Sequence, residues 1–120
     1  MVNKQEFLNA IYQDIEIVKG DTLAFNFQLQ GLQGETPEIY FSCAEHYDET
    51  PLFTLDLIDG ISLEDYNIAT DTATYSVRVA PIKTKDLDLN RYYYDLEATI
   101  SGDVLTLMRG RLTLLYGVTN

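Results

Sequence analysis

Between residues 23 and 30, larger apolar side chains alternate one by one with polar or small ones. The apolar positions are Leu23, Phe25, Phe27 and Leu29, and polar or small residues fill the positions between them. An extended segment of this kind places one side in a core and the other in water. A helix is excluded here because the same residues would be spread around its circumference. The chain therefore contains at least one half-buried β-strand.

Similar short segments recur along the 120 residues, separated by turn signals such as Lys19-Gly20-Asp21, Asp59-Gly60 and Ser101-Gly102-Asp103. They cover residues 15–17, 39–43, 52–58, 61–69, 75–79, 92–100 and 104–115. Seven or eight short strands with turns about every 8–12 residues are typical of an antiparallel β-sandwich. We therefore predict an all-β fold with a single β-sandwich domain over residues 13–120 and an N-terminal arm over residues 1–12.

The apolar side chains of the last predicted strand, residues 104–115, change from one face to the other part-way along the strand. Leu105 and Leu107 occupy odd positions, whereas Leu112 and Leu114 occupy even ones. A two-residue period can change in this way only if one extra residue is inserted. We predict a β-bulge near Arg109–Gly110.

Residues 81–91 interrupt the alternation and favour the immunoglobulin-like version of the sandwich. Thr84 can cap a single helical turn, and Leu87 or Leu89 can anchor that turn in the core. The strand that follows opens with three tyrosines, which is where a tyrosine corner would lie. Tyr92 is our choice for the corner, with Tyr94 as the alternative.

Charge is divided unevenly along a chain whose net charge is −11. Residues 1–71 hold fourteen acids and two bases, a net −12, whereas residues 72–120 hold five acids and six bases, a net +1. The acidic excess argues against nucleic acid and anionic membrane surfaces as partners. If Arg91, Arg109 and Arg111 share one face, the molecule carries complementary patches suited to packing against copies of itself.

The N-terminal arm has features of a short helix. Asn3 and Glu6 have the spacing of a capping box, and Phe7, Leu8 and Ile11 would share one helical face. The arm is either frayed or docked on a neighbouring subunit. It lacks the features of a signal peptide, so we expect synthesis in a reducing compartment without export.

Candidate residues for chemistry are few. His46, the single histidine, lies in a loop beside two acids, while Cys43 faces the predicted core. The acid pairs Asp56/Asp59, Glu64/Asp65 and Asp86/Asp88 match no calcium loop. We assign no catalytic, cofactor-binding or metal-binding residue, expect no cofactor, and predict that the protein is not an enzyme. A small hydrolase built on an acid pair is the least favoured alternative.

Nine tyrosines and no tryptophan favour contacts with proteins over contacts with sugars. Tyr40 and Tyr93 are predicted on outer faces, and Tyr47 lies in a loop. These three residues are the candidates for a receptor- or glycan-binding site, which remains a weaker alternative.

One region has a recognisable pattern. Ala80-Pro81-Ile82-Lys83-Thr84-Lys85-Asp86-Leu87 is followed by Tyr92-Tyr93-Tyr94-Asp95-Leu96-Glu97, then by Gly102, Val104, Thr106-Leu107, Gly110 and Val118-Thr119. Together with Lys19-Gly20-Asp21-Thr22-Leu23 near the front, this order resembles structural proteins of tailed phages and prophages of Gram-positive hosts. The N-terminal domain of phage baseplate upper proteins looks similar. Asn90-Arg91 departs from the glycine-bearing turn of the family, and residues 1–14 lie outside the pattern.

The resemblance implies a virion building block, a β-sandwich with no catalytic residues to carry over. We expect a non-enzymatic component of the tail or baseplate that forms homo-oligomers and contacts other virion proteins. It would be made in the cytoplasm of the bacterial host and end in the virion. A head decoration or head-fibre protein of the same phage class is the main alternative, and sequence does not separate the two.

Overall fold

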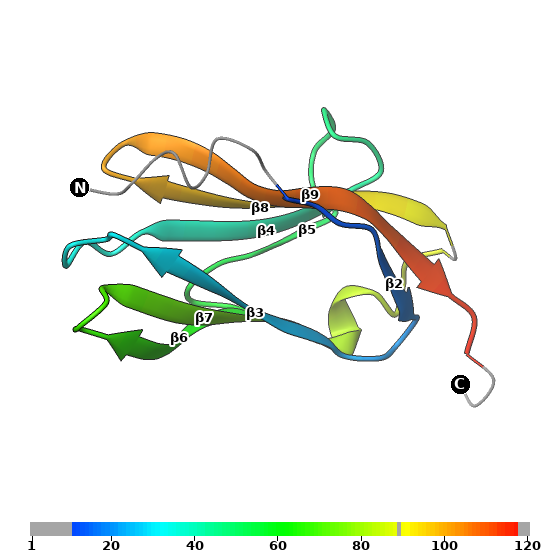
Figure 1. The fold of residues 1–120 in the computed structure, drawn as a ribbon. Helices are drawn as coiled ribbons and strands as arrows, with labels where there is room; N and C mark the ends of the chain where they lie inside the picture. The colour runs from blue at the N-terminus through cyan, green and yellow to red at the C-terminus, as the bar shows by residue number, and fades with distance from the viewer. Residues whose placement is uncertain (1–10, 89, 118–120) are drawn as a thin grey trace.

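The computed structural model describes residues 11–88 and 90–117, which form two β-sheets packed face to face (Figure 1). Sheet A has the strand order β1-β9-β8-β4-β5, with β2 also paired to β9, and sheet B has the order β3-β7-β6. The predicted all-β sandwich is confirmed. The helix predicted within the arm rests mostly on Asn3, Glu6, Phe7 and Leu8, which lie outside the described residues; Ile11 belongs to a strand.

The elements of sheet A are β1 (Ile11–Tyr12), β2 (Ile15–Val18), β4 (Glu38–Ala44), β5 (Phe53–Leu55), β8 (Arg91–Ile100) and β9 (Asp103–Leu115). Those of sheet B are β3 (Leu23–Gln30), β6 (Ile61–Asn67) and β7 (Thr72–Val79), and the 3-10 helix η2 (Pro81–Lys83) follows β7. Pairing is antiparallel except that β1 and β2 run parallel to β9. Nine strands are described where seven or eight were predicted, and the additional one is the two-residue β1.

The core lies between the sheets, and the predicted inward-facing residues of its central strands fill it. The side chains at most 2% exposed include Leu29, Ile39, Phe41, Leu55, Ile61, Val77, Val79, Tyr94, Leu96 and Leu112. Phe41 is central, because its ring stacks on that of Tyr94 at a centroid distance of 5.3 Å and meets that of Phe25 at 6.0 Å. The inward facing of these side chains thus follows directly from the two-residue alternation of the sequence.

The predicted strand over residues 52–58 is shorter in the structure. β5 ends at Leu55, and the Asp56 carboxylate accepts hydrogen bonds from the backbone N–H groups of Ile58 and Asp59, at 2.9 and 2.8 Å. This local turn competes with strand pairing. Alternation in a strand over 52–58 would place Leu57 on the same face as Phe53 and Leu55, but after the turn Leu57 is 37% exposed.

The bulge in β9 is real, but its predicted position was wrong. The register against β8 shifts between Leu96 and Glu97, which pair with Met108 and Thr106, so Leu107 is the inserted residue. Gly110 serves another purpose: a Cβ atom there would lie 2.2 Å from the backbone oxygen of Gln13. Glycine is required at position 110 because the link between β1 and β2 crosses directly over it.

The tyrosine corner is confirmed at Tyr92. Its hydroxyl donates a hydrogen bond of 3.0 Å to the carbonyl oxygen of Asp88, four residues upstream. Thr84 ends η2 and also opens the next turn, because its carbonyl oxygen accepts a hydrogen bond of 3.0 Å from the Leu87 N–H. Its fully buried hydroxyl has no hydrogen-bond partner among the described residues, so the side-chain cap is absent. Leu87 packs against the core as predicted, and Leu89 lies outside the described residues.

Candidate functional site

Sheet A presents its outer face to solvent, and one end of that face carries aromatic and basic side chains. Tyr93 of β8 pairs with Arg111 of β9, and Asp95, two residues further along β8, pairs with Arg109. Arg91 is two residues away from Tyr93 in β8, so it lies on the same face. All three arginines that were considered from the sequence therefore share this face.

The loop after β4 places Tyr47 over this surface. The Tyr47 hydroxyl donates a hydrogen bond of 3.2 Å to the carbonyl oxygen of Gly110 in β9. Its ring lies 4.7 Å from that of Tyr93, and the Arg109 guanidinium lies 4.2 Å from its centroid. We call Tyr47, Tyr93 and Arg109 the tyrosine–arginine cluster. A cation held over an aromatic face is stabilised by the charge distribution of the ring.

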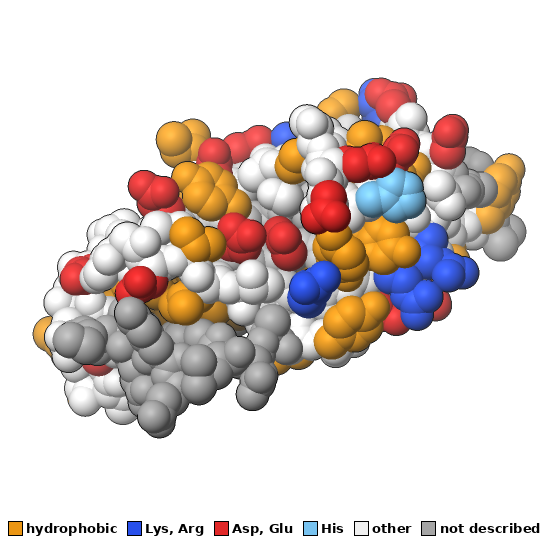
Figure 2. Space-filling model, turned by 90° about the horizontal axis from the view of Figure 1, so that it is seen from above, with side chains coloured by type: hydrophobic (Ala, Val, Ile, Leu, Met, Phe, Trp, Pro, Cys, Tyr) orange, Lys and Arg blue, Asp and Glu red, His pale blue; other side chains and the backbone are white. Residues whose placement is uncertain are grey.

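His46 extends the same surface, because its ring lies 6.2 Å from that of Tyr93. Figure 2 shows the molecule from above, with the histidine beside hydrophobic side chains. Lys and Arg side chains lie on one side of this group, and Asp and Glu side chains lie on the other. The side chain of His46 is exposed, and the group beside it is the aromatic ring of Tyr93. Covalent hydrolysis would require a nucleophile in that place.

Arg111 is held in place by the link between β1 and β2. Its guanidinium forms an ion pair of 3.1 Å with the Asp14 carboxylate, and its backbone N–H donates to the same carboxylate at 3.0 Å. These hydrogen bonds lower the pKa of Asp14 and raise that of Arg111. Arg109, in contrast, is exposed and directed at the ring of Tyr47, and its charge also acts on Asp95, its register partner in β8.

Carboxylates lie next to the cluster along β8. Asp95 and Glu97 follow Tyr93 on the outer face and line a shallow hollow of about 190 Å³ with Tyr47 and Glu49. Burial raises the pKa of Asp95, and burial together with the charge of Asp95 raises the pKa of Glu97. The outer face of sheet A thus has a basic end and an acidic continuation within one strand.

The residues considered for chemistry are not brought together. Cys43 is buried, and burial raises the pKa of its thiol to about 12, which keeps it protonated at neutral pH. Asp59 forms an ion pair of 2.9 Å with Lys83, and Glu64 accepts hydrogen bonds from Ser62 and Ser76. Within residues 11–88 and 90–117, no three His, Cys, Asp or Glu side chains are grouped to hold a metal ion.

Of the three tyrosine candidates, the structure joins Tyr47 and Tyr93 and leaves Tyr40 apart. Tyr40 pairs with Glu97 and donates a hydrogen bond of 3.3 Å to Glu38, whereas Tyr93 pairs with Ala44 at the other end of β4. The contact of Tyr47 with Arg109 joins residues 62 positions apart through a loop. No spacing in the sequence marks such a contact.

Comparison with known proteins supports the fold alone. No family model matches the sequence, and no curated protein matches it. Among solved structures, the chain is similar to part of a family 123 glycoside hydrolase from Clostridium perfringens, studied for glycolipid glycan hydrolysis, with a TM-score of 0.57 and 13% identity. The match covers 100% of this chain and 26% of that chain, so this chain spans about a quarter of the enzyme's length. Among the described residues, no helix is long and apolar enough to cross a bilayer.

Proposed function

We propose that this protein is a non-enzymatic structural component of a phage virion, belonging to the tail or baseplate, which assembles through the outer face of sheet A. The observation that carries the proposal is the tyrosine–arginine cluster, in which Arg109 lies over Tyr47 beside Tyr93. The sequence pattern of residues 80–119 supports the virion assignment, because it resembles structural proteins of tailed phages.

The cluster has the properties of a protein-binding surface. Tyr and Arg are the residue types enriched at the energetic centres of interfaces, since both combine large flat area with hydrogen-bonding groups. The ring contacts and the hydrogen bond of Tyr47 to Gly110 hold the cluster in place before a partner arrives. Preorganised side chains lose little conformational entropy on binding, which favours assembly.

Charge favours contact with further copies of the chain. The basic end of the face holds Arg91 and Arg111, Arg109 and Asp95 are register partners in its middle, and Glu97 continues the face along β8. Oppositely charged ends on one molecule can meet on successive copies, and contacts between two different patches build rings. Homo-oligomerisation and contact with other virion proteins are therefore both part of the proposal.

The proposal is tested in particles. The gene is expressed in its phage or prophage context, lysates are separated on a density gradient, and the chain is followed by mass spectrometry across the fractions. We expect the chain to sediment with tailed particles at a fixed ratio to the major tail proteins. Recovery only among slowly sedimenting proteins at the top of the gradient would contradict a structural role in the virion.

The same preparation separates the tail assignment from a head decoration or head-fibre protein. Isolated tails and isolated heads are analysed side by side. We expect enrichment in the tail fraction, and enrichment in heads would move the protein to the alternative class.

Glycan or receptor binding is the second candidate function, and the hollow beside Tyr47 and Tyr93 favours it. Asp95 and Glu97 could accept hydrogen bonds from sugar hydroxyls there. Arg109, however, already occupies one face of the Tyr47 ring, which reduces the flat aromatic area that a sugar needs. A glycan array probed with the full chain tests this candidate, and binding lost in Tyr93→Ala would support it over assembly.

A further inference from the structure

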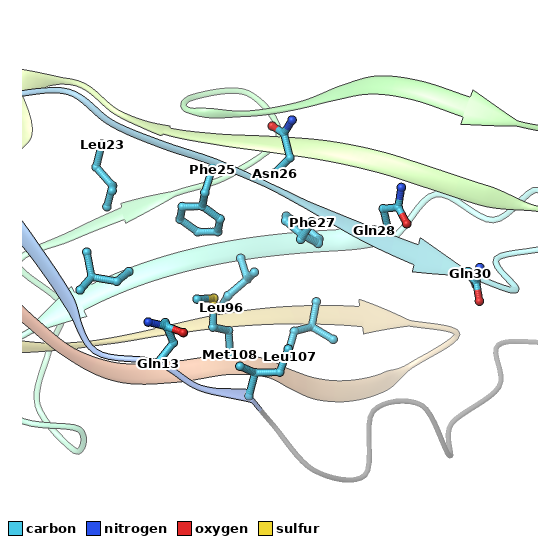
Figure 3. Close-up of a pocket in the computed structure, with 12 residues that line it drawn as sticks. Gln13, Leu23, Phe25, Asn26, Phe27, Gln28, Gln30, Leu96, Leu107 and Met108 are labelled. Atoms are coloured by element: carbon cyan, nitrogen blue, oxygen red, sulfur yellow. The ribbon is translucent and has the colours of Figure 1, made fainter.

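The two sides of the sandwich differ in charge. On one side, an apolar groove of about 810 Å³ lies between the sheets where β3 faces β9 (Figure 3). Phe25 and Phe27 of β3 and Leu107 and Met108 of β9 line this groove, and each of its described lining residues is uncharged. On the side of β6, exposed apolar side chains lie next to carboxylates in the same strand. Of these two sides, the β6 side therefore offers a partner both apolar area and charge.

The apolar part of the β6 side consists of inward-facing positions that sheet A does not cover. Leu63 and Tyr66 of β6 pair with Tyr75 and Ala73 of β7. The β7 partners are 4% and 2% exposed, whereas Leu63 and Tyr66 are 55% and 42% exposed. Sheet A ends in β5, which has three residues and can cover only part of the seven-residue β6. Large apolar side chains that stay exposed beside a core are typical of a surface that binds another protein.

The acidic part of this side lies in the middle of β6. Glu64 and Asp65 are both exposed, and the Glu64 carboxylate accepts hydrogen bonds of 2.9 and 2.8 Å from Ser62 and Ser76. Ile68, directly after β6, is 84% exposed. We define the β6 patch as Leu63, Glu64, Asp65, Tyr66 and Ile68. Residues 20–77 contain eleven acids and no Lys or Arg, so the β6 patch belongs to a strongly acidic part of the chain.

The tyrosine–arginine cluster has the complementary chemistry. It combines the rings of Tyr47 and Tyr93 with the guanidinium of Arg109. Arg91 is exposed on the same face of sheet A. A surface that is both apolar and acidic can cover such rings and pair with such cations. The β6 patch of a second copy therefore fits the cluster.

The carboxylates next to the cluster are less suited to this contact. Asp95 pairs in register with Arg109, whose charge already acts on it. Asp95 and Glu97 are only partly exposed, and burial raises the pKa of both carboxyls. Glu64 and Asp65 are exposed on a strand of the other sheet, so an approaching copy reaches them without first separating an existing contact between Asp95 and Arg109.

The two surfaces lie on different parts of the molecule. The cluster is on the outer face of sheet A, whereas β6 belongs to sheet B, on the far side of the sandwich from β9 (Figure 1). We propose that the β6 patch of one copy binds the tyrosine–arginine cluster of the next copy. Contacts between two different patches run head to tail and continue into a ring or a filament. This proposal rests on the proposed assembly through the outer face of sheet A, and it names the surface that meets that face.

Sedimentation velocity of the full chain in low salt tests the contact with two variants. Arg109→Ala alters the cluster and keeps the β6 patch, whereas Asp65→Lys reverses a charge in the patch and keeps the cluster. We expect each variant alone to associate about tenfold or more weakly than the wild type. An equimolar mixture should form one-to-one dimers and nothing larger, because the intact cluster of one variant can meet the intact patch of the other.

Two further variants serve as controls. Asp21→Lys makes the same charge change at an exposed acid in the turn before β3, and it should associate as the wild type does. Asp65→Asn removes the charge without reversing it and should weaken association less than Asp65→Lys does. Asp65→Asn also keeps the test valid if circular dichroism shows that Asp65→Lys does not fold.

The results separate this contact from the proposed assembly face. Wild-type association of the folded Asp65 variants, together with a loss in Arg109→Ala, would overturn the β6 contact and leave the assembly face standing. Undiminished association of all variants would overturn both. Oligomers in the mixture as large as those of the wild type would contradict a contact between these two patches.

Discussion

The centre of the sandwich and its β3–β9 side are built from the same alternating pattern, yet they are buried to different degrees. In the centre, Phe41, Val77 and Val79 are fully buried between β4, β7 and neighbouring strands. On the β3–β9 side, Phe25 and Phe27 obey the same alternation and remain partly exposed along the groove. The difference shows that alternation determines which way a side chain faces, while the neighbouring strands determine whether it is covered.

The largest expected effect separates these two regions. Phe41→Ala removes a fully buried ring in contact with Phe25, Phe53 and Tyr94, and should lower the free energy of unfolding by about 3–5 kcal/mol. Phe25→Ala should cost roughly half as much, because its ring borders the groove and leaves a smaller enclosed void. Urea unfolding measures both, and equal losses would remove the distinction between centre and side.

A steric substitution tests the boundary between the regions. Gly110→Ala forces a Cβ atom against the backbone of Gln13 and should cost about 1–3 kcal/mol. It should also speed hydrogen exchange over β1 and β2, which must move away from β9. Gly34→Ala is the control: that glycine has a φ of 83° and open space around it, so its strain should leave exchange in β1 and β2 unchanged.

A smaller effect is expected at the tyrosine corner. Tyr92→Phe keeps the buried ring and removes the hydrogen bond to Asp88, which should cost about 1 kcal/mol. Tyr92 belongs to the well-covered part of the core, so the loss should appear as a uniform decrease in stability. A thermal melt identical to that of the wild type would show that the corner contributes nothing measurable.

The smallest effect concerns Thr84, whose buried hydroxyl oxygen has no hydrogen-bond partner among the described residues. Thr84→Val keeps the shape and removes that group, so stability should stay within about 0.5 kcal/mol of the wild type or rise. Thr72→Val is the matched comparison, because its hydroxyl accepts hydrogen bonds from Gln30 and Thr70, and it should destabilise. A clear loss in Thr84→Val would indicate a buried water bound to its hydroxyl.

Much of the fold could be predicted from the sequence, because a two-residue period assigns each side chain to one face. Local patterns of this kind predict the strand over residues 23–30 and the face on which each side chain of β8 lies. They also predict the tyrosine corner at Tyr92. We predicted the bulge at the wrong position because Gly110 lies between the pairs Leu105/Leu107 and Leu112/Leu114, and a glycine inside a strand often marks a bulge. Glycine is needed at position 110 because the backbone of Gln13, which is distant in sequence, crosses over it. The local alternation of side chains does not indicate this contact.

The candidate site was only partly predictable for the same reason. Alternation placed Tyr93 on an outer face, and the charge division drew attention to Arg109 and Arg111. The position of Tyr47 depends on the path of the loop after β4 and on its bond to Gly110. Contacts that a loop makes across a sheet do not recur at a regular spacing, so no sequence pattern predicts them.

The most direct test of the central claim is sedimentation velocity of the full chain at high micromolar concentration, in low salt and in about 1 M NaCl. We predict reversible self-association in low salt that weakens in high salt, and a loss of affinity of about tenfold or more in Arg109→Ala. Arg78→Ala, which removes an exposed arginine from β7 of sheet B, should behave as the wild type. A monomer under all conditions, or equal association of the wild type and both variants, would contradict assembly through the outer face of sheet A.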